Sequence, residues 1–269
     1  MQGLQEIQKP EALAKAKVPK FLADLMRLLD MPPVPVIFIR EVTVIEHLDV
    51  PQAGTAPRAP ISPFYRYYLD RYQESLADKV AVHIARAPER IYCGRSHLLR
   101  KGGILGCSYF EARMKEAGVY CSTPEEMSLG QQLGHLMGAK TLVFDEGSSA
   151  HPTQVLSQVD TEFLMLPRRA KNNIYGMAIS QRAPFQLLCK GENVETLPDR
   201  YGGTTSPGGM GVYRVPQMVY NKLRRRGLVT EPLDMEAYRA AEEADLVTSQ
   251  SNTEEVHAKR LALLRDIRG

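Results

Sequence analysis

The sequence predicts an α/β fold in which a Rossmann-like parallel sheet is flanked by helices. From residue 90 onward, short apolar segments alternate with segments of helical periodicity. Residues 128–138 give the clearest helix, because Leu129, Leu133 and Leu136 recur at the spacing of a single buried face. Strands separated by helices of this length are joined by right-handed crossovers, so they lie parallel in one sheet. We expect these strands at residues 90–94, 119–122, 141–145 and 162–166.

The residues before 63 predict a short N-terminal segment. Residues 20–30 have the periodicity of a helix with one apolar face, and the double proline after them ends it. Residues 34–40 and 42–48 are rich in β-branched side chains and predict two strands. Residues 50–63 have the Pro, Gly and Ala content of a linker, so we place a boundary there. The apolar face of the first helix consists of Phe21, Leu25, Leu28 and Leu29.

Helices are also expected around and after the alternating region. One of about 20 residues follows the linker and carries Phe64, Tyr68, Leu76 and Val80. Another turns Phe110 and Met114 inward, and residues 201–211 read as a turn-rich loop. Three helices are expected in the tail, at residues 216–226, 234–243 and 253–268. The expected organisation is a short segment at 1–62, a Rossmann-like domain at 63–215 and helices packing back at 216–269.

Composition narrows the class of protein. The net charge is only +3 and the basic runs are short, so no dense basic stripe for nucleic acid is expected. The four cysteines form no CxxC pair, which favours reduced thiols in a cytoplasmic protein over a zinc site. No stretch approaches the ~20 apolar residues of a membrane span. Peripheral association with the inner face of a membrane stays an open alternative.

The turn at residues 146–152, EGSSAHP, follows an apolar strand and opens the next helix. Ligands of open α/β sheets bind beyond the carboxyl ends of strands, where such turns lie. Gly147 allows close approach of the backbone, and Ser148 or Ser149 is expected to cap the helix. The free N–H groups of its first turn suit a phosphate. Glu146 instead suits sugar hydroxyls, a ribose or a neighbouring arginine.

A second loop, at residues 95–106, leaves an earlier parallel strand and contains Arg95, Arg100 and Lys101. Arginine presents a planar fork of donors that matches phosphate oxygens, and lysine adds a point charge. If the two loops face each other, they form a clamp for a diphosphate. Such a clamp suits a nucleotide diphosphate-sugar, whose leaving group gains negative charge as the glycosidic bond breaks.

Each of these signals also has an ordinary structural explanation. A serine-rich turn is more often a helix cap than a ligand site, a basic loop is often plain surface, and a lone histidine such as His151 is more often a satisfied polar residue. The sequence contains no P-loop, no strand-following GxGxxG, no GxSxG, no HExxH and no DxD pair. No metal site is therefore expected, and the positive charge for a nucleotide would come from arginine and lysine.

Residues 90–151 as a linked series resemble glycosyltransferase family 61, in particular its bacterial members tied to capsular or other surface polysaccharides. The resemblance runs through "RIYCGRSHLLRKGGILG", "YFEARMKEAGVYCSTPEEMSLGQQLGHLMGAKTLVF" and "DEGSSAH". It covers about 60 residues of the chain, on the donor side of the family's fold. The positions that carry it are Arg95, Arg100, Lys101, Glu125, Glu126, Ser128, Gln132, Glu146, Gly147, Ser148 and His151.

The resemblance implies a GT-B-type fold and inverting transfer from a nucleotide-sugar donor to a glycan acceptor, without an obligatory metal. An inverting reaction needs a base for the acceptor hydroxyl. His151 and Glu146 are the candidates, and His151 ranks first because the ordinary histidine pKa is near neutral. The residues expected to bind the nucleotide-sugar are Arg95, Arg100, Lys101, Glu126, Ser128, Gln132, Gly147, Ser148 and Ser149.

Two departures from the family pattern keep alternatives open. Gly106 and Cys107 stand where an acidic residue is usual, unless Glu111 substitutes for it. The segment before residue 63 is also short for a first GT-B domain. The acceptor side is then reduced, or a partner chain or second protomer supplies it, or the chain is a non-catalytic subunit that binds nucleotide or glycan. An unrelated α/β interaction module with basic C-terminal helices is the third alternative.

Overall fold

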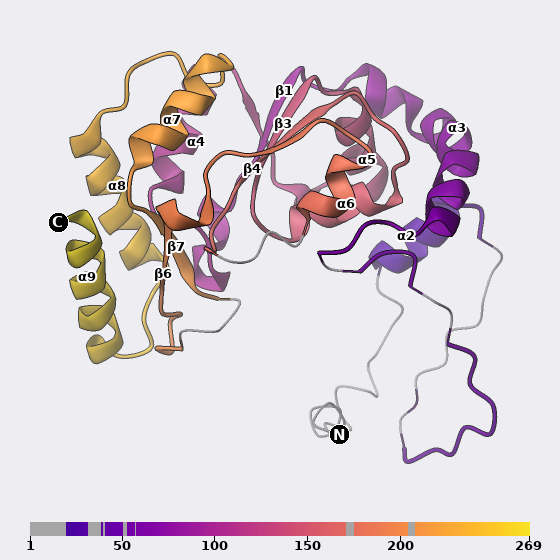
Figure 1. The fold of residues 1–269 in the computed structure, drawn as a ribbon, viewed down its shortest axis with the longest axis horizontal. Helices are drawn as coiled ribbons and strands as arrows, with labels where there is room; N and C mark the ends of the chain where they lie inside the picture. The colour runs from indigo at the N-terminus through magenta and orange to yellow at the C-terminus, as the bar shows by residue number, and fades with distance from the viewer. Residues whose placement is uncertain are drawn as a thin grey trace.

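The computed structural model describes residues 20–31, 39, 41–50, 53–56, 58–170, 175–203 and 208–269. A five-stranded parallel sheet lies at the centre of the described chain (Figure 1). Its strands are β1 (Arg90–Cys93), β2 (Tyr120–Cys121), β3 (Thr141–Asp145), β4 (Glu162–Leu166) and β5 (Phe185–Leu187). The predicted α/β class and the first four strands are confirmed, whereas β5 was not predicted.

The strand order is β2-β1-β3-β4-β5. The chain therefore builds the sheet in one direction from β1 to β2 and in the other from β3 to β5. The boundary between β1 and β3 is the switch point of this doubly wound order, where the loops at the carboxyl ends of the strands diverge and leave a crevice. Both loops singled out in the sequence, at residues 95–106 and 146–152, leave the sheet at this edge.

The two faces of the sheet support separate apolar cores, because successive strand side chains point to opposite faces. Tyr92 and Val143 belong to one core, and Ile91 and Leu142 belong to the other. The second core is covered by α2 (Lys20–Leu28), α3 (Pro63–Ala85), α5 (Leu129–Gly138) and α6 (Gly176–Ser180). The first is covered by α4 (Cys107–Glu116), α7 (Pro216–Arg225), α8 (Met235–Thr248) and α9 (Glu254–Arg268). Figure 1 shows these two helical layers on either side of the strands.

Local sequence explains the start and the packing of α3 and α5. Ser62 caps α3 by accepting a hydrogen bond from the N–H of Tyr65, and a proline occupies the first turn. A Cβ at Gly134 of α5 would lie 2.3 Å from the Cβ of His83, so glycine is what permits the two helices to approach this closely. Of the residues that the sequence placed on α3, Leu76 and Val80 are buried, whereas Phe64 is 79% exposed.

The C-terminal helices pack on the first core and complete the start of α4. Asp245 of α8 accepts hydrogen bonds from the backbone N–H groups of Gly106 at 2.8 Å and Ser108 at 3.3 Å. The side chain of Glu111, the candidate substitute for the missing acid, bonds to Ser96 and Lys115. A two-stranded antiparallel sheet, β6 (Val194–Leu197) and β7 (Met210–Tyr213), adds to this core and was not predicted.

The N-terminal segment differs from the prediction. The first helix is confirmed as α2, but residues 42–48 form no strand, and Val42 and Val44 are almost fully exposed. β-branched residues favour a strand only where a neighbouring strand pairs with them, and these residues have no such neighbour among those described. The strand predicted at 34–40 lies outside the described residues apart from Ile39. None of the described helices combines the length and apolar character needed to cross a bilayer.

Candidate functional site

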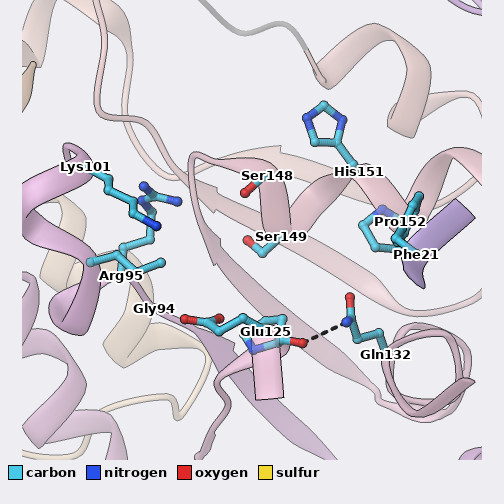
Figure 2. Close-up of a pocket in the computed structure, with 12 residues that line it drawn as sticks. Phe21, Gly94, Arg95, Lys101, Glu125, Gln132, Ser148, Ser149, His151 and Pro152 are labelled. Carbon is cyan, nitrogen blue, oxygen red and sulfur yellow. Dashed lines mark hydrogen bonds between the residues drawn. The ribbon is translucent and has the colours of Figure 1, made fainter. Parts of the chain in front are cut away.

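A cavity of about 560 Å³ opens at the carboxyl edge of the sheet, at the switch point between β1 and β3. We refer to it as the switch-point cavity. Its walls come from the loops after β1, β2 and β3, together with one residue each of α2 and α5. A volume of this size lies within the range of small-molecule and cofactor sites. The two loops predicted to face each other therefore line a single cavity (Figure 2).

Arg95 and Lys101 form the cationic wall of the switch-point cavity (Figure 2). Arg95 is 8% exposed, and its Nε and Nη2 both donate to the carbonyl of Gly102 at 3.2 Å. Arginine has five N–H donors, so three remain for a ligand. Lys101 is exposed at the end of the 3₁₀ helix η2 (Ser96–Lys101). Arg100 is exposed as well, but it does not line this cavity, so the predicted clamp loses one of its three cations.

Ser148 and Ser149 line the cavity from the 3₁₀ helix η4 (Ser148–Val155). The prediction that one of them caps this helix is wrong, because Gly147 occupies the cap position and no side chain makes a capping bond. The Oγ of Ser149 is buried and has no hydrogen-bond partner among the described residues. A buried hydroxyl without a partner is costly, so this donor is available to a ligand in the cavity.

Gly147 permits close contact between the two loops. A Cβ at this position would lie 2.8 Å from Nη1 of Arg95, which is too close for two atoms that are not hydrogen-bonded. The backbone here is extended, so the requirement for glycine comes from space and not from its conformational freedom. Gly147 therefore acts by leaving room for the guanidinium of Arg95.

Glu146 does not line the switch-point cavity. It is 1% exposed, its Oε2 accepts the backbone N–H of Arg168 at 2.9 Å, and its Oε1 lies 3.9 Å from Nε of Arg169. Burial raises the pKa of Glu146 despite these arginines. Of the three partners that the sequence suggested for Glu146, the structure provides the neighbouring arginine. Of the two candidate bases in the 146–151 turn, His151 lines the cavity and Glu146 does not.

The arginines close to Glu146 concentrate positive charge next to the cationic wall. The pKa of Arg168 falls to about 10, first because of burial and then because of the charges of Arg169 and Arg95. The buried carboxylate of Glu146 offsets part of this charge. The carboxylate of Glu146 thus lies between Arg168 and Arg169, and the charge of Arg95 acts on Arg168.

His151 lies at the rim of the cavity, on η4. Its Nδ1 is 3.2 Å from Nε2 of Gln154, and its Nε2 is 3.4 Å from the hydroxyl of Tyr175. Partial burial lowers the pKa of His151, so the neutral ring that can accept a proton predominates at neutral pH. His151 also lines a small neighbouring cavity of about 120 Å³, together with Tyr175 and Arg182.

The loop after β2 contributes a carboxylate that differs from the expected one. Glu125 lines the cavity, whereas Glu126 bonds to the hydroxyl of Thr123 at 2.9 Å and does not line it. Burial raises the pKa of Glu125, but its own backbone hydrogen bond, His97 and Arg95 outweigh burial and lower the pKa overall. The carboxylate therefore stays ionised within the electrostatic reach of Arg95.

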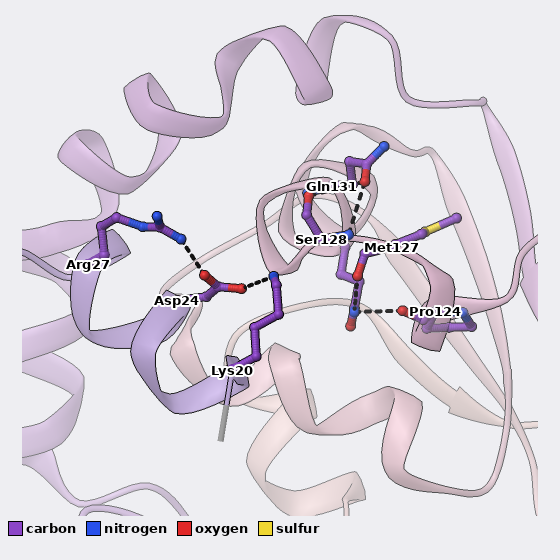
Figure 3. A network of polar contacts seen from close by, with 8 residues as sticks. Lys20, Asp24, Arg27, Pro124, Met127, Ser128 and Gln131 are labelled. Atoms are coloured by element: carbon purple, nitrogen blue, oxygen red, sulfur yellow. Dashed lines mark hydrogen bonds and ion pairs between the residues drawn. The ribbon is translucent and has the colours of Figure 1, made fainter. Parts of the chain in front are cut away.

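Ser128 and Gln132 have different roles in α5. Ser128 is the helix cap, and it forms a reciprocal pair of hydrogen bonds with Gln131 (Figure 3). It does not line the cavity. Gln132 does, and its Nε2 donates to the carbonyls of Pro124 at 2.7 Å and Met127 at 3.4 Å. Gln132 thus holds the turn that carries Glu125 against α5.

Sequence reasoning missed two contributors to the site. Asp145 is fully buried at the end of β3, where it accepts hydrogen bonds from the Tyr92 hydroxyl and the Arg95 backbone. An acidic residue ending an apolar strand was a usable signal for it. Phe21 of α2 lines the cavity from the far side, and nothing local in its sequence indicated this.

No protein-family model matches the chain, and no curated protein matches it either.

Proposed function

We propose that the chain is an inverting glycosyltransferase of the family 61 type, which moves a sugar from a nucleotide diphosphate-sugar to a glycan acceptor of a surface or capsular polysaccharide. The observation that carries this proposal is the switch-point cavity itself, where Arg95 and Lys101 share the space with Ser148 and Ser149. Cations and hydroxyl donors around one cavity suit a diphosphate. The sequence resemblance supplies the reaction type.

In the proposed reaction, Arg95 and Lys101 bind the diphosphate, and Ser149 donates to one of its oxygens. The acceptor hydroxyl attacks the anomeric carbon from the face opposite the diphosphate. The bond from that carbon to the diphosphate oxygen breaks, and its electron pair stays on the leaving group. Preorganised positive charge stabilises the leaving group as its negative charge grows. His151 takes the proton of the acceptor hydroxyl, since it is the neutral base at the rim.

The finer expectations belong to the same proposal. They are a GT-B-type arrangement, a cytoplasmic location with peripheral association at the inner face of the membrane as an open alternative, and chemistry that needs no metal or organic cofactor. The acceptor side would come from the N-terminal segment, from a second protomer or from a partner chain. The described part of the segment before residue 63 forms one helix, α2, and no strand.

Gly106 and Cys107, which stand where the resemblance expects an acidic residue, favour a second candidate function, a subunit that binds nucleotide or glycan without turning over. The two functions separate in an assay that measures release of nucleoside diphosphate from a panel of nucleotide-sugars, with and without glycan acceptors. A transferase releases nucleoside diphosphate, and its His151→Ala variant still binds donor but releases at least about 100-fold less. Donor that binds without any release would support the subunit, and absence of donor binding would contradict both the transferase and a nucleotide-binding subunit.

A further inference from the structure

The switch-point cavity has two chemically different ends. Arg95 and Lys101 stand at one end, while the ring of Phe21 and Pro152 stand at the other (Figure 2). The serine hydroxyls lie between them. A nucleoside diphosphate has the same polarity, because its charged diphosphate and its flat, weakly polar base lie at opposite ends of the molecule.

Phe21 is held at the cavity by the packing of α2. Leu25 and Leu28 pack against the second core, and Lys79 of α3 donates to the carbonyl of Leu28 at 2.8 Å. Asp24 is buried and pairs with Lys20 and Arg27 on its own helix (Figure 3). The helix is therefore anchored by residues other than Phe21.

Phe21 itself is 48% exposed, although the periodicity of α2 places it on the apolar face with Leu25 and Leu28. It is the member of that face that lines the cavity and leaves much of its ring uncovered. An aromatic ring held in this way offers a flat surface on which any nucleobase can stack.

We propose that Phe21 is the stacking platform for the base of the bound nucleotide, and that α2 is thereby part of the nucleotide site. This inference rests on the proposed function, because it takes the ligand to be a nucleoside diphosphate. It assigns the N-terminal segment a role in donor binding, beyond the acceptor-side role expected from the resemblance.

The test compares two ligands that differ only in the part that Phe21 would contact. Isothermal titration calorimetry measures the affinity for inorganic pyrophosphate and for the tightest of UDP, GDP, ADP and CDP. Phe21→Ala is expected to weaken nucleoside diphosphate binding at least about fivefold, the lower end of the effect of removing a base-stacking aromatic. Pyrophosphate affinity is expected to stay unchanged, and Phe21→Tyr to bind both ligands as the parent does.

Leu22→Ala is the matched control, because Leu22 is exposed on the same helix and does not line the cavity. Hydrogen exchange provides a second measurement: the nucleoside diphosphate, but not pyrophosphate, is expected to slow exchange of the α2 amides. A Phe21→Ala variant that binds the nucleoside diphosphate as tightly as the parent overturns the inference and leaves the proposed function intact. A parent that binds neither ligand overturns both.

Discussion

The backbone N–H of Arg95 donates a hydrogen bond to Oδ2 of Asp145 at 2.8 Å, and this bond joins the loop after β1 to the end of β3. The hydroxyl of Tyr92 donates to the other oxygen of the same carboxylate at 2.9 Å. One buried acid therefore positions Arg95, one of the two residues of the cationic wall. The guanidinium of Arg95 then reaches the space beside Gly147, on the opposite wall of the cavity.

The titration of Asp145 gives a pH-dependent contribution to stability. Burial raises its pKa to about 7, even though Tyr92 and the Arg95 backbone favour the ionised form. A folded-state pKa above the unfolded value means that protonation favours the folded state. This contribution to the free energy of unfolding is complete below about pH 4 and is lost as the pH rises through 7.

We therefore expect the parent to lose about 2 kcal/mol of stability, relative to an Asp145→Asn variant, between pH 5 and pH 8. Urea denaturation at the two pH values measures this difference. Asp266→Asn, at an exposed position of α9, is the control. A parent-to-variant difference that stays constant, or that changes in the other direction, would contradict the role of burial.

Gly147→Ala tests the contact between the two walls. The added Cβ would fall 2.8 Å from Nη1 of Arg95, so the guanidinium has to move while the extended backbone stays as it is. We expect about tenfold weaker nucleoside diphosphate binding by calorimetry, with little change in the thermal unfolding midpoint. Gly130→Ala, where the new atom meets ordinary contacts of 3.6 Å or more, should leave binding unchanged. If both variants bind the nucleoside diphosphate with equal affinity, the contact between Gly147 and Arg95 does not support binding.

Asp245→Ala tests how the C-terminal helices support the site. The substitution removes the acceptor for the N–H groups of Gly106 and Ser108 at the start of α4. We expect the free energy of unfolding to fall by about 2 kcal/mol, since a helix cap is lost and buried donors are left unpaired. Urea denaturation measures the loss, and Asp266→Ala is the exposed comparison. A loss no greater than that of Asp266→Ala would show that the cap does not matter.

The local sequence pattern was sufficient to predict the strands that are buried in the sheet. The strands at 141–145 and 162–166 contain the apolar runs 142–144 and 163–166, and they form β3 and β4 with the predicted bounds. β5 was missed because its three residues, Phe185–Leu187, are too short to show a period. Residues 42–48 show the opposite failure, in which β-branched composition predicted a strand that no described neighbour pairs with.

The site was predictable only as far as topology could be inferred. Parallel strands bring the loops after β1 and β3 to one edge, so the sequence could place Arg95 and Lys101 near Ser148 and Ser149. It could not distinguish Lys101 from Arg100, or Glu125 from Glu126, because a 3₁₀ turn decides which neighbour faces the cavity. Phe21 enters through packing of a distant helix, for which the sequence carries no local signal.

The cationic wall is tested most directly by titrating the tightest of the four nucleoside diphosphates into the parent and into three alanine variants. Arg95→Ala and Lys101→Ala are expected to weaken binding at least about tenfold, because each removes a charge-assisted contact with the diphosphate. Arg100→Ala, from the same basic loop but outside the cavity, is expected to bind as the parent does. If the Arg95→Ala and Lys101→Ala variants fold and bind as tightly as the parent, Arg95 and Lys101 do not bind the diphosphate. If only Arg100→Ala loses affinity, the diphosphate binds outside the switch-point cavity.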